Sequence, residues 1–222
     1  MPRVHHVKKA RKDNPAVKKG QPYYHWQRYR SRKQYSATYP KRSQLTSSGK
    51  LATIYDAEDN VGNFGIDSSD RDCLLMSLQG FEGAVREAGE SFREVGEEYG
   101  ESADNLEEYF SGSQQIDDIR EKADACETAA DDADTLADEL SDTHERLVDL
   151  GDEPTEDAPG DDLEKPSEVD YDDAEDPEEA WQEAFEAWQV AVSDAADEWQ
   201  TEFDDIANDA DNHASEFEGP QF

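Results

Sequence analysis

Residues 74–109, LLMSLQGFEGAVREAGESFREVGEEYGESADNLEEY, carry the pattern that decides the fold. Apolar and small side chains recur there at spacings that alternate between four and three residues. The positions are Leu74, Leu78, Phe81, Val85, Ala88, Phe92, Val95, Tyr99, Ser102, Leu106 and Tyr109. This heptad spacing places all of them on one face of an α-helix. The stretch therefore predicts a long amphipathic helix that buries one stripe against other helices.

Two further stretches carry the same kind of stripe. The second is mostly alanine and comprises Ile116, Ile119, Ala123, Cys126, Ala130, Ala133, Ala137, Leu140, His144 and Leu147. The third is aromatic and comprises Trp181, Phe185, Trp188, Val192, Ala195, Trp199, Phe203, Ile206, Ala210, His213 and Phe217. Small residues facing large ones let helices interdigitate. The three stripes predict an antiparallel helical bundle or coiled coil of about three helices.

Capping and helix-breaking residues set the boundaries of these helices. Ser68-Ser69-Asp70 suits the N-cap of the first helix, Gly151 suits the end of the second, and Pro177 suits the first turn of the third. The short break near Gly112 favours an antiparallel pair. We predict a helical hairpin over residues 68–150, an acidic, proline-containing linker over 151–176, and a third long helix over 177–218 that packs on the hairpin.

Charge divides the 222 residues into two parts. Residues 1–50 contain fourteen Lys and Arg against one acid, Asp13, a formal net charge of +13. Residues 51–222 contain seven basic and 56 acidic residues, a net charge of −49. The acidic part spreads its carboxylates among apolar positions and has abundant alanine and only two lysines, and this composition resembles that of halophilic archaeal proteins. At ~1 M salt the Debye length is ~3 Å, so such a surface repels itself little. The alternative interpretation is disorder.

Several classes of protein are excluded by composition. Hydrophobic residues make up 34% of the chain, and no stretch approaches the ~18 apolar residues of a membrane span. Two cysteines do not make a disulfide scaffold. Cys126 lies on the second stripe and is predicted to be a small core residue, too far along the helices from Cys73 to pair with it. The first residues are basic without an apolar run, so we expect no secretory signal.

The sequence also predicts neither enzyme activity nor a cofactor. It has no Gly-rich phosphate loop and no Cys-x-x-Cys or His-Glu-x-x-His motif. Carboxylates occur throughout, so no pair stands out as acid and base. His5, His6 and His25 would hold a metal only if strands brought them together with a further ligand, and we predict no metal site.

Residues 1–45, called the arm below, are basic and aromatic and are predicted to form a small antiparallel β module. Between Pro22 and Pro40, aromatic and polar side chains alternate on both sides of a polar turn at residues 31–34, which is a β-hairpin pattern. Two strands alone are marginally stable in water, so the sheet needs a further element. Residues 4–10 are predicted to supply it as a third strand. Residues 46–67 are predicted to supply a linking helix, over about 46–59, and a loop.

Cations interleaved with aromatic rings favour nucleic acid as the partner of the arm. Lys and Arg release counterions from phosphates, rings stack on exposed bases, and a two-stranded ribbon fits a major groove. The predicted contact residues are Lys8, Lys9, Arg11, Lys12, Lys18, Lys19, Tyr24, Trp26, Arg28, Arg30, Arg32, Lys33, Lys41 and Arg42. The alternative is that the arm pairs with the chain's own acidic helices or with another acidic protein.

Two resemblances bear on the arm. Its β-β-β-α order resembles the arm-type DNA-binding domains of tyrosine recombinases, whose catalytic part has no counterpart here. The runs VKKARKDN at 7–14, YYHW at 23–26 and PKRSQLT at 40–46 resemble a protein family met in phage and haloarchaeal viral genomes. That resemblance implies a virus or mobile-element context and no particular activity.

Together these observations predict a non-enzymatic nucleic-acid-binding or architectural protein. The arm would contact DNA, favoured over RNA, and the acidic helices would serve assembly, including contacts with a second copy of the chain. The alternative is a scaffold-like viral protein whose arm binds an acidic protein surface. We expect no membrane partner, and a location in a high-salt cytoplasm or in a virion.

Overall fold

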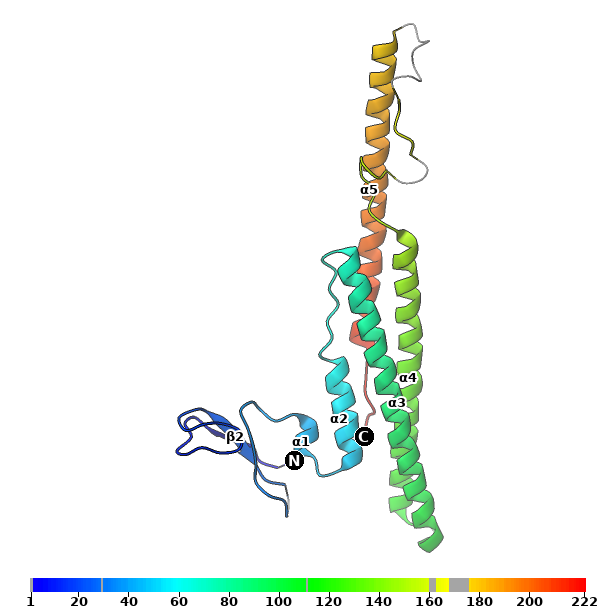
Figure 1. The fold of residues 1–222 in the computed structure, drawn as a ribbon. Helices are drawn as coiled ribbons and strands as arrows, with labels where there is room; N and C mark the ends of the chain where they lie inside the picture. The colour runs from blue at the N-terminus through cyan, green and yellow to red at the C-terminus, as the bar shows by residue number, and fades with distance from the viewer. Residues whose placement is uncertain (1, 29, 111, 160–162, 168–175) are drawn as a thin grey trace. The chain divides into compact units, whose positions relative to one another are not determined.

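The computed structural model covers residues 1–222 and describes all of them except 1, 29, 111, 160–162 and 168–175. The chain is mainly α-helical, with a small antiparallel sheet near the N-terminus followed by long helices, which confirms the predicted fold class (Figure 1). The residues group into two compact units. Unit one contains residues 1–65, 81–138 and 216–222, and unit two contains residues 66–80 and 139–215.

Three short strands form the sheet: β1 (His5–Val7), β2 (Tyr23–Trp26) and β3 (Gln34–Ser36). β2 lies in the middle and pairs antiparallel with both neighbours, as predicted for the hairpin and its third strand. β2 ends at Trp26 although the alternation continues further. The backbone turns there, because the Ser31 amide donates to the Arg28 carbonyl at 3.0 Å and Arg30 adopts a left-handed φ of 56°.

Two helices follow the sheet where the sequence predicted one. α1 (Arg42–Leu45) is a single turn, and α2 spans Gly49–Val61. Thr46 between them has an extended backbone with ψ of 153°, so the helix cannot begin there. α2 begins instead after Ser48, whose hydroxyl oxygen accepts a hydrogen bond from the Leu51 amide at 3.3 Å.

The hairpin consists of α3 (Arg71–Tyr109) and α4 (Gln114–Leu150), whose portions in unit one lie side by side in Figure 1. Asp70 caps α3, because its carboxylate accepts a hydrogen bond from the Cys73 amide at 2.7 Å. Ion pairs of 2.6 Å between Arg93 and Asp134 and of 3.1 Å between Arg86 and Asp138 fix the antiparallel register. The buried stripe positions are Leu74, Leu78, Phe81, Val85, Ala88, Phe92, Val95, Ile116, Cys126, Ala130, Ala133, Ala137, Leu140 and Leu147. The periodicity therefore identified most of the core, although the stripe position Tyr109 is 74% exposed.

Two glycines let the helices of the hairpin approach closely. A Cβ atom added at Gly89 would lie 3.2 Å from the Ala133 Cβ, and one at Gly96 would lie 3.2 Å from the Cys126 Cβ. Gly100, one turn further along α3, has no atom within 4 Å of its added Cβ. The small residues of α4 and the glycines of α3 are thus matched across one interface.

Replacing Gly96 by Leu is expected to destabilise unit one by about 1–3 kcal/mol, because the added side chain overpacks the interface against the Cys126 side chain and the Ala123 carbonyl. Gly100→Ala is the matched control and should stabilise the protein by about 0.5–1 kcal/mol, through helix propensity alone. Urea unfolding followed by circular dichroism measures both. Equal stability of the two variants would contradict the close approach.

The rest of unit one covers the hairpin with α2 and the C-terminal tail. Lys50 of α2 donates to the Ser102 hydroxyl at 3.0 Å and lies 4.3 Å from the ring centre of Tyr99. In the tail, Phe217 stacks on Phe92 with ring centroids 6.2 Å apart, and the edge of Phe222 contacts Tyr99. α2 therefore holds the arm to the hairpin through α3.

In unit two, α5 (Pro177–Glu216) has two different partners. Its C-terminal half contacts α4, through an Arg146–Asp209 ion pair of 2.7 Å. Its N-terminal half contacts the predicted linker, since the Trp188 indole donates to the Leu163 carbonyl at 3.3 Å. The sequence predicted the hairpin as its partner. The N-terminal half differs from this prediction because α4 ends at Leu150, and Gly151, with φ of 70°, redirects the chain so that the Leu163 carbonyl reaches α5.

Candidate nucleic-acid interface

One face of the sheet gathers aromatic and imidazole rings from all three strands. The register places His5, His25 and Tyr35 opposite one another, with Tyr23 two residues before His25 on the same face of β2. Ring centroids are 5.0 Å apart for His5–His25, 6.0 Å for Tyr23–Tyr35 and 6.3 Å for His25–Tyr35. All four side chains are partly or fully exposed. We call His5, Tyr23, His25 and Tyr35 the ring face.

On the opposite face Trp26 belongs to the core of the arm, whereas His6 is exposed and Tyr24 is partly exposed. Trp26 is 3% exposed, and its indole Nε1 donates a hydrogen bond to the Gln44 carbonyl of α1 at 3.1 Å. Trp26, which the sequence predicted as a nucleic-acid contact, is therefore placed in the core of the arm. Alternation along β2 showed that two faces exist but not which of them the helix covers. Tyr24 lies on the same face as Trp26, partly exposed, and stacks on His6 with centroids 4.7 Å apart.

Most of the predicted cationic residues are exposed at the surface. The exposed ones are Lys8, Lys9, Arg11, Lys12, Lys18, Lys19, Arg30, Arg32, Lys33, Lys41 and Arg42. Within the described part of the chain, no acidic side chain pairs with Lys8, Lys9, Arg11, Lys12, Lys18, Lys19, Arg32, Lys33 or Lys41. Lys33 lies 5.8 Å from the centre of the Tyr35 ring. The cationic side chains that form no ion pair in the described part of the chain are therefore available to contact a partner.

Two predicted contact residues have structural partners instead. Arg28 is partly buried, and its guanidinium donates to the Thr46 carbonyl at 2.7 Å. Arg42 pairs with Glu58 of α2 at 2.7 Å and lies 4.1 Å from the centre of the Tyr55 ring. Both bonds connect the arm to the segments around α1 and α2, so these residues position the sheet.

The connection between β1 and β2 is an ordered loop that displays six of the cations. The Ala10 amide donates to the Gln21 carbonyl at 2.9 Å, and Ala10 itself is buried. The Asn14 side chain accepts hydrogen bonds from two backbone amides, and the Asp13 carboxylate accepts one from the Lys19 amide at 2.6 Å. The single acid of the arm therefore orders the loop and neutralises no cation by an ion pair.

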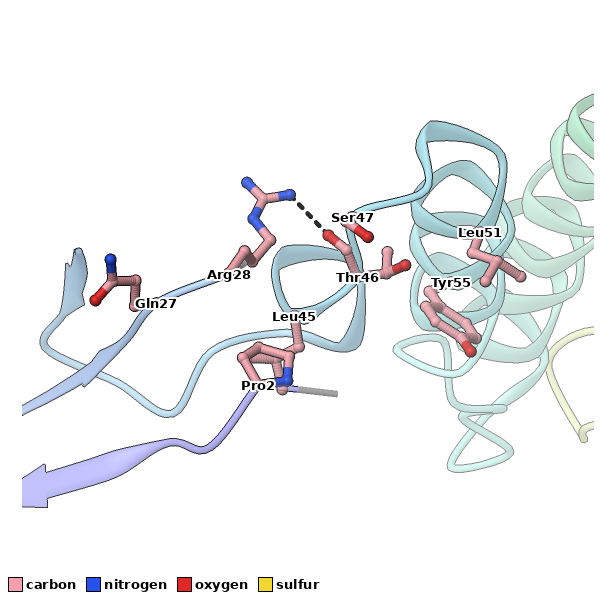
Figure 2. A pocket seen from close by; sticks show the side chains of 8 residues that line it. All are labelled: Pro2, Gln27, Arg28, Leu45, Thr46, Ser47, Leu51 and Tyr55. Carbon is pink, nitrogen blue, oxygen red and sulfur yellow. Dashed lines mark hydrogen bonds between the residues drawn. The ribbon is translucent and has the colours of Figure 1, made fainter. Parts of the chain in front are cut away.

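A groove of about 440 Å³ lies between the N-terminal residues, the segment that follows β2, and the helices α1 and α2 (Figure 2). Its lining residues are Pro2, Gln27, Arg28, Leu45, Thr46, Ser47, Leu51 and Tyr55. Figure 2 shows the Arg28 guanidinium turned toward the Thr46 carbonyl at its edge. The sequence did not predict this groove, because its walls come from four separate segments and no local pattern links them.

The structure divides the three histidines of the arm between the two faces of the sheet and leaves both cysteines unpaired. His5 and His25 share the ring face, whereas His6 lies on the other face, so the sheet does not bring the three together. Both cysteines are free. Cys126 is fully buried in the hairpin, as predicted, and this burial raises the pKa of its thiol to about 11.

Burial of the His25 ring, together with the positive charge of Lys33 and the neighbouring His5, holds the pKa of His25 below its usual value of 6.5. Folding therefore favours the neutral ring. Its contribution to stability is fully present above pH 6.5 and is lost as the pH falls through the lowered pKa. At neutral pH the ring face presents an uncharged imidazole beside a charged ammonium group.

Lys33→Gln is expected to raise the pKa of His25 without restoring it fully, because the charge is removed while the burial remains. A titration of the His25 ring protons by NMR measures this. Lys41→Gln, which removes an exposed arm charge that does not contribute to this shift, should leave the titration unchanged. An unchanged pKa in Lys33→Gln would show that the two side chains do not interact.

Comparison with protein-family models, curated proteins and solved structures found no match to this chain. Among the described residues, no helix is long and apolar enough to cross a membrane.

Proposed function

We propose that this chain is a non-enzymatic nucleic-acid-binding or architectural protein, in which the arm contacts DNA or RNA and the acidic helices serve assembly. The observation that carries the proposal is the ring face, flanked by exposed cations that have no acidic partner among the described residues. Cations supply attraction to phosphates by counterion release. Rings supply stacking, which is insensitive to base identity.

A high-salt cytoplasm is the proposed setting, on the basis of the −49 charge of residues 51–222. Binding through Z phosphates weakens with log salt at a slope of about −0.9Z for duplex DNA. In such a cell the ring face would therefore carry a larger share of the affinity than the cations. The resemblance of the arm to viral proteins supports a virus or mobile-element context.

The alternative function is a scaffold-like protein whose arm binds an acidic protein surface. The Arg42–Glu58 pair, with Arg42 over Tyr55, shows how one arm cation already docks on an acidic helix. Lys50 pairs with Glu98 in a similar way, at 3.9 Å. The loop cations from Lys8 to Lys19 have no such acid among the described residues, so self-neutralisation is a poor account of the remaining charge.

The test compares the full-length protein with a variant in which Lys8, Lys9 and Lys12 are replaced by Gln. Labelled DNA and RNA are titrated at several KCl concentrations. The slope of log affinity against log salt should become shallower by roughly 0.7–0.9 for each phosphate that the protein no longer neutralises. The matched control replaces the same residues by Arg, which keeps the charge and should keep the slope. Failure of the parent to bind DNA or RNA at any salt, with binding to an acidic protein, would favour the alternative.

A further inference from the structure

We infer that the ring face binds unpaired bases of a single-stranded nucleic acid, rather than the groove of a duplex. This inference rests on the proposed function and specifies its ligand. Single-stranded DNA and single-stranded RNA both offer unpaired bases whose flat faces can stack on aromatic side chains.

The kind of surface that the strands present favours a single-stranded ligand. Tyr23, His25 and Tyr35 offer ring surfaces across neighbouring strands, with centroids 6.0–6.3 Å apart. Bases in a duplex are stacked on each other and present only their edges in the grooves, where hydrogen-bonding side chains read them. Bases in a single strand present their faces, which stack on aromatic side chains. A face built from rings therefore suits the single strand.

The position of the charges relative to the rings also favours a single-stranded ligand. Lys33 immediately precedes β3 and lies 5.8 Å from the Tyr35 ring centre, while Lys8 and Lys9 directly follow β1. The neutral state favoured for His25 leaves the middle of the face uncharged. Cations at the margin and uncharged rings in the middle match a ligand with a charged backbone and flat bases.

The test uses the full-length protein and fluorescence anisotropy. Its probes are a labelled thymidine oligonucleotide, a uridine oligonucleotide and a duplex, all of the same length, in molar KCl. The parent should bind the single strands more tightly than the duplex. Replacing Tyr23 and Tyr35 together by Leu should weaken single-strand binding by roughly 10- to 100-fold, the loss expected when base stacking is removed. Duplex binding should change little.

Two controls separate ring loss from damage to the fold. Replacing Tyr23 and Tyr35 by Phe keeps the rings and should retain most of the affinity. Tyr39→Leu removes a ring that is 64% exposed but contacts Tyr24 on the opposite face, and it should bind like the parent. Tighter binding of the duplex, or parental single-strand binding by the Leu variant, would overturn the inference while the proposed function stands. No binding of any of the three probes at any KCl concentration would overturn the proposed function itself.

Discussion

Trp26→Ala is expected to destabilise the arm by about 3–5 kcal/mol, the range for removing a large buried aromatic side chain. Trp26 is 3% exposed, and the other buried hydrophobic side chains of the arm, such as Ala10 and Leu45, are smaller. Trp26 is therefore the largest buried side chain of the arm. The substitution also removes the hydrogen bond that joins β2 to α1. The exchange rate of the β2 amides, measured in the full-length protein, should rise to that of amides with no hydrogen-bond protection. The affinity for nucleic acid should decrease in the same variant.

The controls for this prediction distinguish a core role from a recognition role. Trp26→Phe keeps most of the buried ring and should lose much less stability. Tyr39→Ala removes an exposed ring and should leave the exchange of β2 unchanged. A Trp26→Ala protein that keeps its protected sheet and still loses nucleic acid would show that the indole contacts the ligand directly.

Trp188→Ala is expected to destabilise unit two by a similar amount, about 3–5 kcal/mol. Trp188 is 5% exposed, and its ring packs against Phe185 with centroids 5.5 Å apart and lies 5.2 Å from the Lys165 ammonium. Its indole also holds the linker through the Leu163 carbonyl. Thermal unfolding in molar KCl should show the loss, and hydrogen exchange should locate it in the N-terminal half of α5.

Val190→Ala on the same helix is the matched control, because Val190 is 59% exposed and should change stability little. Nucleic-acid binding should survive both substitutions, since the ring face lies in unit one. If Trp188→Ala melts like the parent but no longer captures a protein partner, the aromatic stripe of α5 is an interface instead.

The helical part could be predicted from the sequence because its determinants are local and periodic. The stripe from Leu74 to Val95 and the buried Cys126 follow from heptad spacing, and the role of Asp70 follows from capping chemistry. The contact of the C-terminal half of α5 with α4 agrees with the predicted packing on the hairpin, whereas the partner of its N-terminal half could not be predicted. A stripe shows that one face is buried, but whether a helix or an irregular segment covers it depends on where α4 ends.

The candidate site was predictable in composition but not in geometry. Alternation showed strands, rings and cations, yet the assignment of Trp26 to the core and of Tyr23 and Tyr35 to the open face required the position of α1. The same holds for Arg28 and Arg42, whose charge favours phosphate but whose partners come from neighbouring segments. Side-chain type indicates what a residue can bind, and tertiary contacts decide whether it is free to do so.

Photo-crosslinking of the full-length protein to a single-stranded oligonucleotide, followed by peptide mapping, tests the central claim most directly. The arm contains both the ring face and its opposite face, so the position of the adduct discriminates between them. The account predicts adducts on Tyr23, His25 or Tyr35, reduced by unlabelled single strands more than by duplex. Adducts confined to Tyr39 or to the acidic helices would contradict it.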